Sequence, residues 1–157
     1  YYEKSLAIYL KALGEEHPEV GTSYNNIGEA YYHKGEYDKA IGYFEKALGI
    51  SIKVLGAAHP LVGASYNNIG GAYNAKGEYD KAIGYFEKSL AISLKARGAE
   101  HPSVGITYNN IGSAYDNKGD KTKAMAYFLK AKAIFLKKLG PEHPRTKSLQ
   151  SLIDGLK

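Results

Sequence analysis

The sequence His-Pro-Glu-Val at residues 17–20 returns as His-Pro-Leu-Val at 59–62 and as His-Pro-Ser-Val at 101–104. A fourth copy begins with His-Pro at 143–144 and then diverges, so the interval is 42 residues each time. A period of this size is typical of one supersecondary unit that has been stacked several times. We therefore expect an elongated array whose function lies on a surface that the stack creates.

The first two complete repeats, residues 17–58 and 59–100, differ at only eleven of 42 positions. Each repeat of such an array contacts mainly its neighbours, so its hydrophobic core is a long strip. The chain contains fifteen tyrosines and no tryptophan. Because tyrosine buries a large ring but needs a partner or water for its hydroxyl, we expect these rings at the edges of the core.

Each repeat contains two runs of apolar residues at helical spacing. Tyr24, Ile27 and Tyr31 are three and four residues apart, which places them on one face of a helix. A second run begins at Tyr37 and continues to Leu55. We expect a helix A at about 19–34 and a helix B at about 37–55, packed antiparallel because the turn between them is short.

Glycines have two expected roles in the repeat. Gly35 and Gly56 follow the two helices and are expected to cap them. Gly28 lies on the apolar face of helix A, where a missing side chain lets another helix approach. Gly42 and Gly49 each cost up to about 1 kcal/mol inside a helix, and the sequence offers no compensating reason for them.

We expect one repeat domain over residues 1–157. Its parts are a partial repeat with helix B only (1–16), three complete repeats (17–58, 59–100 and 101–142) and a C-terminal capping helix (143–157). Because the chain begins inside a repeat, we expect it to be a piece of a longer protein. The apolar side of the first helix is predicted to consist of Tyr2, Leu6, Tyr9, Leu10 and Leu13.

The repeat resembles the tetratricopeptide repeat (TPR). That family has a bulky residue, Leu-Gly, Tyr, a turn Gly, Ala, an aromatic residue and Ala at fixed spacings, and the matching residues are Tyr24, Ile27, Gly28, Tyr31, Gly35, Ala40, Phe44 and Ala47. The 42-residue length is most similar to the subtype found in kinesin light chains. The resemblance implies an all-α, right-handed superhelical solenoid with helix A on its concave face, and it implies protein–protein interaction as a class.

A stripe on helix A lies opposite its apolar face and is not needed for packing. In the first repeat its five positions are Thr22, Asn25, Glu29, Tyr32 and His33. Four of the eleven differences between the first two repeats fall on the five positions of this stripe, and only its asparagine is constant. By resemblance, the stripe lines a concave groove. The residues predicted to bind a peptide there are Thr22, Asn25, Glu29, Tyr32, His33, Asn67, Asn74, Ile106, Asn109, Ser113, Asp116 and Asn117.

The constant asparagines are Asn25, Asn67 and Asn109, and each is followed by a second asparagine. A side-chain amide can pair with a peptide backbone of any sequence. The alternative is that one asparagine of each pair bridges adjacent helices. If the first asparagine binds peptide, replacing Asn67 and Asn109 with Ala should weaken binding and leave melting unchanged. No Lys or Arg lies on the stripe, which disfavours a C-terminal carboxylate or a strongly acidic ligand.

Catalysis and metal binding are not expected. Four of the five histidines precede a proline, one per repeat. Ligands of one metal ion lie about 2.0–2.1 Å from it, whereas packed helices are about 8–10 Å apart, so these histidines are expected to shape the links between helices. The sequence has no His-Glu-x-x-His, Gly-x-Ser-x-Gly or phosphate-loop motif. We expect no enzyme activity and no cofactor.

The expected partner is a protein or peptide. The net charge is +5, but lysines such as Lys34 and Lys39 recur in each repeat beside acidic residues, which indicates a solvated outer face and not a nucleic-acid site. No apolar run approaches the roughly 18 residues of a membrane span. The absence of cysteine suits a reducing compartment, so the expected location is cytoplasmic.

An alternative function is structural self-association. An array without a polar cap exposes apolar surface. Near-identical repeats can also exchange helices between chains or stack end to end. A homo-oligomer formed through the truncated N-terminal helix is therefore the second hypothesis.

Overall fold

The computed structural model describes residues 2–156, apart from the side chains of Tyr2, Glu3 and Ser5. Tyr1 and the side chain of Tyr2, which the sequence assigns to the first helix, lie outside this description. Residues 2–156 form eight helices and no strand: α1 (Tyr2–Leu13), α2 (Pro18–His33), α3 (Tyr37–Leu55), α4 (Pro60–Lys76), α5 (Tyr79–Arg97), α6 (Pro102–Asn117), α7 (Lys121–Leu139) and α8 (Pro144–Gly155).

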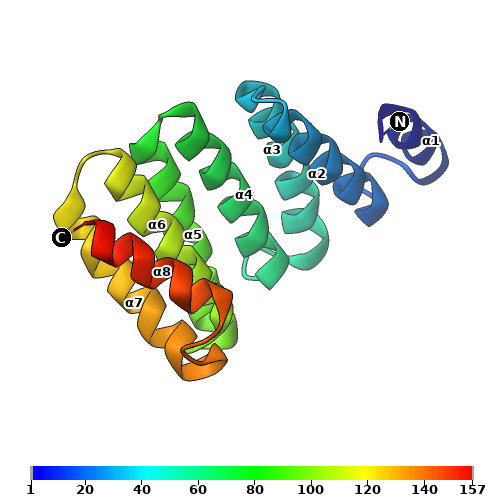
Figure 1. Ribbon diagram of the computed structural model, residues 1–157. Coiled ribbons are helices and arrows are strands. Elements are labelled where there is room, and N and C mark those ends of the chain that lie inside the picture. The colour runs from blue at the N-terminus through cyan, green and yellow to red at the C-terminus, as the bar shows by residue number, and fades with distance from the viewer. Residues whose placement is uncertain (1, 157) are drawn as a thin grey trace.

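The helices follow one another in a stack, with α1 at one end and α7 and α8 at the other (Figure 1). Each helix packs on the helices before and after it, and α4 also contacts α6. The all-α solenoid is therefore confirmed. The predicted bounds of helices A and B differ by one residue from α2 and agree with α3.

Each helix A begins at the proline of His-Pro, and the histidine before it is the N-cap. The Nδ1 atom of His17 accepts a hydrogen bond from the backbone N–H of Glu19, at 3.2 Å. This bond satisfies one of the donors that a helix start leaves without an intrahelical partner. The structural role predicted for the His-Pro histidines is confirmed, and the same bond is made by His59, His101 and His143.

Helix A ends at a glycine with a left-handed backbone. Gly35 has a φ of 76°, its N–H donates to the carbonyl of Tyr32, and the N–H of Glu36 donates to the carbonyl of Tyr31, both at 3.0 Å. These two bonds form a Schellman motif, which needs a positive φ at the glycine. The predicted capping role of Gly35 is confirmed.

Helix A and helix B of one repeat touch where the sequence places a glycine. A Cβ atom at Gly28 would lie 2.6 Å from Cδ1 of Phe44, so no side chain fits there. The predicted close approach is confirmed. Gly42 and Gly49 have no atom within 4 Å of a Cβ position, and packing does not account for them.

The tyrosines form a stacked group in each complete repeat. Tyr43 of α3 stacks on Tyr31 of α2, with ring centroids 5.5 Å apart, and Tyr24 lies 6.1 Å from Tyr43. The Nζ atom of Lys46 lies over the rings of Tyr24 and Tyr43, where a cation is attracted to the ring faces. All three rings are half-buried, as expected for the core edge. The next repeats place Tyr66, Tyr73, Tyr85, Lys88 and Tyr108, Tyr115, Tyr127, Lys130 in the same way.

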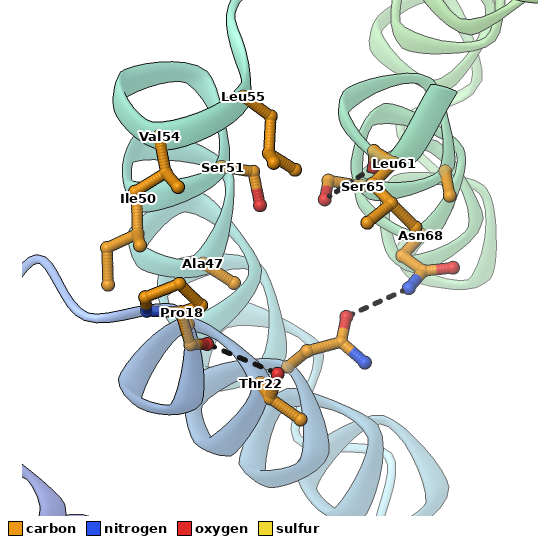
Figure 2. A pocket seen from close by; sticks show the side chains of 13 residues that line it. Pro18, Thr22, Ala47, Ile50, Ser51, Val54, Leu55, Leu61, Ser65 and Asn68 are labelled. Carbon is orange, nitrogen blue, oxygen red and sulfur yellow. Dashed lines mark hydrogen bonds between the residues drawn. The ribbon is translucent and has the colours of Figure 1, made fainter. Parts of the chain in front are cut away.

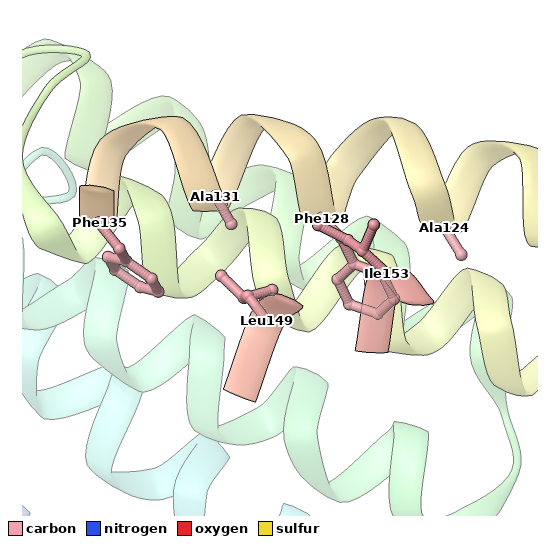
Figure 3. Packing of buried hydrophobic residues seen from close by; sticks show 6 residues of the cluster. All are labelled: Ala124, Phe128, Ala131, Phe135, Leu149 and Ile153. Atoms are coloured by element: carbon pink, nitrogen blue, oxygen red, sulfur yellow. The ribbon is translucent and has the colours of Figure 1, made fainter. Parts of the chain in front are cut away.

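The last helix covers the end of the core. Leu149 and Ile153 of α8 pack against Phe128 and Phe135 of α7 (Figure 3). All four side chains are at most 4% exposed. Ile153 thus occupies the buried position that Ile27 has in α2, as the repeat register predicts.

Among the residues that the structure describes, no helix has the length and apolar character needed to cross a membrane.

Candidate functional site

The first helices of the three complete repeats line a shared hollow, which we call the central pocket. It has a volume of about 460 Å³ and is formed mainly by α2, α4 and α6. Its lining includes six of the predicted peptide-binding residues: Glu29, Tyr32, His33, Asn67, Asn74 and Ser113. The tertiary structure therefore brings together half of the predicted set.

One wall of the central pocket is aromatic and charged, and its middle is open. The ring of Tyr32 meets the ring of His33 edge-on, with centroids 5.7 Å apart. Glu29 accepts a hydrogen bond from Nδ2 of Asn25 at 2.9 Å, which orients its carboxylate. Gly71 lines the pocket and has no atom within 4 Å of a Cβ position. The pocket can therefore accept both polar and aromatic groups of a ligand.

The paired asparagines connect neighbouring first helices. Nδ2 of Asn68 donates to Oδ1 of Asn25 at 3.1 Å, and Nδ2 of Asn110 donates to Oδ1 of Asn67 at 3.0 Å. The bridge thus joins the first asparagine of one repeat to the second asparagine of the next. The bridging alternative is confirmed for these pairs. Peptide binding by Asn25 and Asn67 stays a prediction, because each bridge uses only one of the two lone pairs of the Oδ1 atom.

Asn109 is the exception to this pattern. Its Oδ1 atom is buried and accepts no hydrogen bond. The position in α8 that corresponds to Asn68 and Asn110 is occupied by Leu152, which has no donor. Asn109 therefore lacks the hydrogen bond that Asn25 and Asn67 each accept from the asparagine of the next repeat.

The other predicted site residues lie outside the central pocket. Thr22 and Asn25 line a neighbouring hollow, and the hydroxyl of Thr22 donates to the carbonyl of Pro18 at 3.2 Å. Asn117 donates to Oδ1 of Asn74 at 3.2 Å, and Asp116 lines none of the hollows described here. Ile106 and Asn109 lie beside the last helix. The residues of the stripe therefore occupy equivalent positions in the repeats but line different hollows in the structure.

A seam hollow lies wherever helix A and helix B of one repeat meet helix A of the next. The first is between α2, α3 and α4, the second between α4, α5 and α6, and the third between α6, α7 and α8. Their volumes are about 340, 190 and 180 Å³. Figure 2 shows Leu55 of α3 and Leu61 of α4 on facing walls of the first seam hollow.

Sequence reasoning missed the residues that helix B and the helix starts contribute to these hollows. Val54, Leu55 and Leu61 line the first, Arg97 lines the second and Arg145 lines the third. The two arginines lie outside the stripe on helix A, so the absence of Lys and Arg from that stripe does not disfavour acidic groups of a ligand at the second and third hollows. The sequence could have indicated these residues, because Leu55 and Arg97 occupy equivalent positions in two otherwise similar repeats and differ strongly in chemistry.

Within residues 2–156, no three His, Asp or Glu side chains are grouped so that they could hold a metal ion. The titratable groups with shifted pKa values lie mainly on exposed ion pairs. Lys53, for example, lowers the pKa of Glu16 by donating a hydrogen bond to it.

Sequence comparison identifies one family. The sequence profile of the Tetratricopeptide repeat matches residues 1–53, 19–95 and 61–137, which together span most of the chain. A search of curated proteins finds no match.

Solved structures that are similar to this chain support the same family. A kinesin-light-chain-like protein from Podosopora anserina with nearly identical TPR-like repeats is 30% identical, with a TM-score of 0.82 over 99% of this chain and 73% of that one. BtubC (BKLC) from P. vanneervenii is 21% identical, with a TM-score of 0.83 over 99% of this chain and 62% of its own. The apo form of RapI is 20% identical, with a TM-score of 0.82 over 99% of this chain and 54% of its own.

Proposed function

Because the chain belongs to the tetratricopeptide repeat family, which commonly supplies non-enzymatic scaffolds for protein–protein interaction, we propose that it holds a segment of a partner protein. The segment is an extended peptide or a helix, and it lies along the trough lined by α2, α4 and α6. The observation that supports this most directly is the central pocket, where side chains from all three helices converge.

The lining of the pocket suits a peptide. Amide and hydroxyl groups from Asn67, Asn74 and Ser113 can donate to or accept from a peptide backbone. Tyr32 offers a rigid ring that binds at a low cost in conformational entropy. The constant asparagines would bind the backbone of any peptide, and the variable residues around them would let related arrays bind peptides of different sequence.

A pair of matched variants tests this proposal. Gly71 and Gly84 are both helical and both have free space around a Cβ position, but only Gly71 lines the central pocket. A peptide is first selected from a random library on the unmodified chain. Gly71→Gln should fill the pocket and weaken binding of that peptide, and Gly84→Gln should leave it unchanged. Equal affinity for both variants, measured by fluorescence anisotropy, would exclude the central pocket as the binding site.

The second candidate function is self-association through α1. Ile8 is 65% exposed, although the equivalent residue of the next repeat, Ile50, is 8% exposed because it packs against Gly21 of its own helix A. Leu13 is also exposed, at 43%. These exposed apolar side chains favour contact between copies through α1.

The opposite end of the array does not favour end-to-end stacking. In α2, Gly21 and Gly28 make room for the side chains of α3. The equivalent residues of α8 are Lys147 and Asp154, whose side chains would meet a further helix B. Copies that associate should therefore do so through α1 and not by continuing the stack.

Light scattering over a concentration series tests self-association. The unmodified chain should form dimers as its concentration rises from micromolar to millimolar, and Ile8→Glu should remain monomeric. Leu129, which is 50% exposed on α7, provides the control, because Leu129→Glu should still associate. A monomer over the whole range would rule out this second function.

A further inference from the structure

The three seam hollows have equivalent positions but different chemistry. The first is lined by Val54, Leu55 and Leu61, which are 45%, 41% and 56% exposed and form an apolar patch around its mouth. At the equivalent positions of the second seam, the residues are Ala96, Arg97 and Ser103. An apolar hollow and a cationic, hydroxyl-rich hollow therefore lie one repeat apart along the same trough.

The differences between the first two complete repeats concentrate on these surfaces. Eight of the eleven differing positions line the central pocket or a seam hollow in at least one of the two repeats, namely 19, 22, 29, 32, 33, 47, 54 and 55 with their partners 42 residues on. Outside these hollows, helix B differs only at two pairs, Gly49 with Ala91 and Ile52 with Leu94, and its other outer positions, such as the pair Glu45 and Glu87, are the same. Free drift would alter exposed outer positions as readily, so the pattern points to ligand-contacting positions that include the seams.

The second seam hollow carries a positive charge with no internal counterion. No carboxylate of residues 2–156 forms an ion pair with Arg97. Ser89 and Ser93 line the same hollow beside it. A guanidinium group with hydroxyls nearby binds a carboxylate through charge-assisted hydrogen bonds.

We propose that the seam hollows select side chains of the bound segment: the first seam hollow takes a large apolar side chain, and the second takes a carboxylate. This inference rests on the proposed function. The two seam hollows lie one repeat apart, and each repeat has two helices, so they are separated by at least the spacing of one packed helix pair, about 8–10 Å. An extended chain advances about 3.3–3.6 Å per residue. The ligand is therefore an extended peptide with a residue such as Leu at least about three residues away from an Asp or Glu.

The test uses fluorescein-labelled peptides of Gly, Ser and Ala that carry Leu and Asp three, four, five or six residues apart, in both orders. One order should bind more tightly, because the trough holds the chain in one direction. For that peptide, Asp→Asn should weaken binding about tenfold, as expected for loss of a charge-assisted bond. Arg97→Leu should have the same effect, and added salt should weaken the Asp peptide more than the Asn peptide.

A double variant gives the sharpest result. Leu55→Arg with Arg97→Leu exchanges the chemistry of the two seams, and each new residue is the one that the neighbouring repeat already carries at that position. The preferred order of Leu and Asp in the peptide should then reverse. Circular dichroism should show unchanged helicity, because both positions are exposed.

Two outcomes would overturn the inference: no binding of either order at about 1 mM, or an order preference that the exchange leaves unchanged. The proposed function is tested separately by the library-selected peptide. If Gly71→Gln weakens that peptide while the seam exchange changes nothing, the trough binds peptide but the seams do not select its side chains.

Discussion

At the residue scale, the glycines of one repeat show how the surroundings decide the effect of a methyl group. A Cβ atom at Gly70 would lie 2.7 Å from Cδ1 of Phe86 and 3.2 Å from the carbonyl oxygen of Ala82, whereas Gly84 has free space. We expect Gly70→Ala to lower the free energy of unfolding by about 1–3 kcal/mol through overpacking. Gly84→Ala should raise it by about 0.5–1 kcal/mol, because alanine favours the helix. Urea denaturation measures both, and changes of the same sign would contradict the packing argument.

The asparagine bridges permit a second prediction at this scale. Asn67→Ala leaves Nδ2 of Asn110 without its acceptor and should cost about 1 kcal/mol of stability. Asn109→Ala removes an oxygen that has no partner and should cost less. This prediction differs from the sequence-based expectation that both variants melt like the unmodified chain. Thermal melting monitored by circular dichroism decides it, and a larger loss for Asn109→Ala would argue against the bridge.

At the element scale, exposed ion pairs link neighbouring helices. Nζ of Lys76, at the end of α4, lies 2.6 Å from Oδ1 of Asp38 in α3 and 2.6 Å from Oε1 of Glu78. Hydrogen bonds to Asp38 and Glu78 raise the pKa of Lys76, and hydrogen bonds from Lys76 and Lys81 lower the pKa of Glu78. Each such exposed pair contributes little to stability, but together they give the array a pH dependence.

The direction of that dependence follows from the two shifts. The lowered pKa of Glu78 stabilises the fold above its ordinary value of 4.5, and this contribution is lost as the pH falls through the folded value. The raised pKa of Lys76 stabilises the fold below its ordinary value of 10.5, and this contribution is lost as the pH rises through the folded value. We expect the melting temperature to fall between pH 6 and pH 3.

Lys76→Met should reduce this fall in melting temperature, because it removes a partner of Glu78. Lys95 provides the control, since it forms no ion pair with any residue that the structure describes. Lys95→Met should leave the fall unchanged. Calorimetry at the two pH values measures the difference, and identical profiles for Lys76→Met and the unmodified chain would disprove the role of this pair.

At the scale of the whole molecule, stability should be distributed along the stack. Repeats contact mainly their neighbours, so one end can open while the other stays folded. Leu149 of α8 packs against α7 (Figure 3). Its side chain is 2% exposed, whereas that of Leu152 is 40% exposed. We expect Leu149→Ala to cost about 2–5 kcal/mol, and Leu152→Ala to have little effect.

Hydrogen exchange locates this loss along the chain. In Leu149→Ala, amide protection should fall in α7 and α8 and persist in α2 and α3. A uniform loss along all helices would instead indicate one cooperative unit. Because the test reads stability and not binding, it is independent of the proposed function.

The amino-acid sequence by itself determined the helical class, the helix bounds, the capping glycines and the close contact at Gly28. These features depend on spacing within a few residues or within one repeat, so helical periodicity and comparison of the repeats were enough to predict them. Only the tertiary structure decided that Asn25 pairs with Asn68 and that Leu55 and Leu61 share a hollow. Such contacts join different repeats, and they depend on how far and at what angle one helix pair is displaced from the next. Side-chain packing across the whole stack sets that displacement, and no local pattern in the sequence records it.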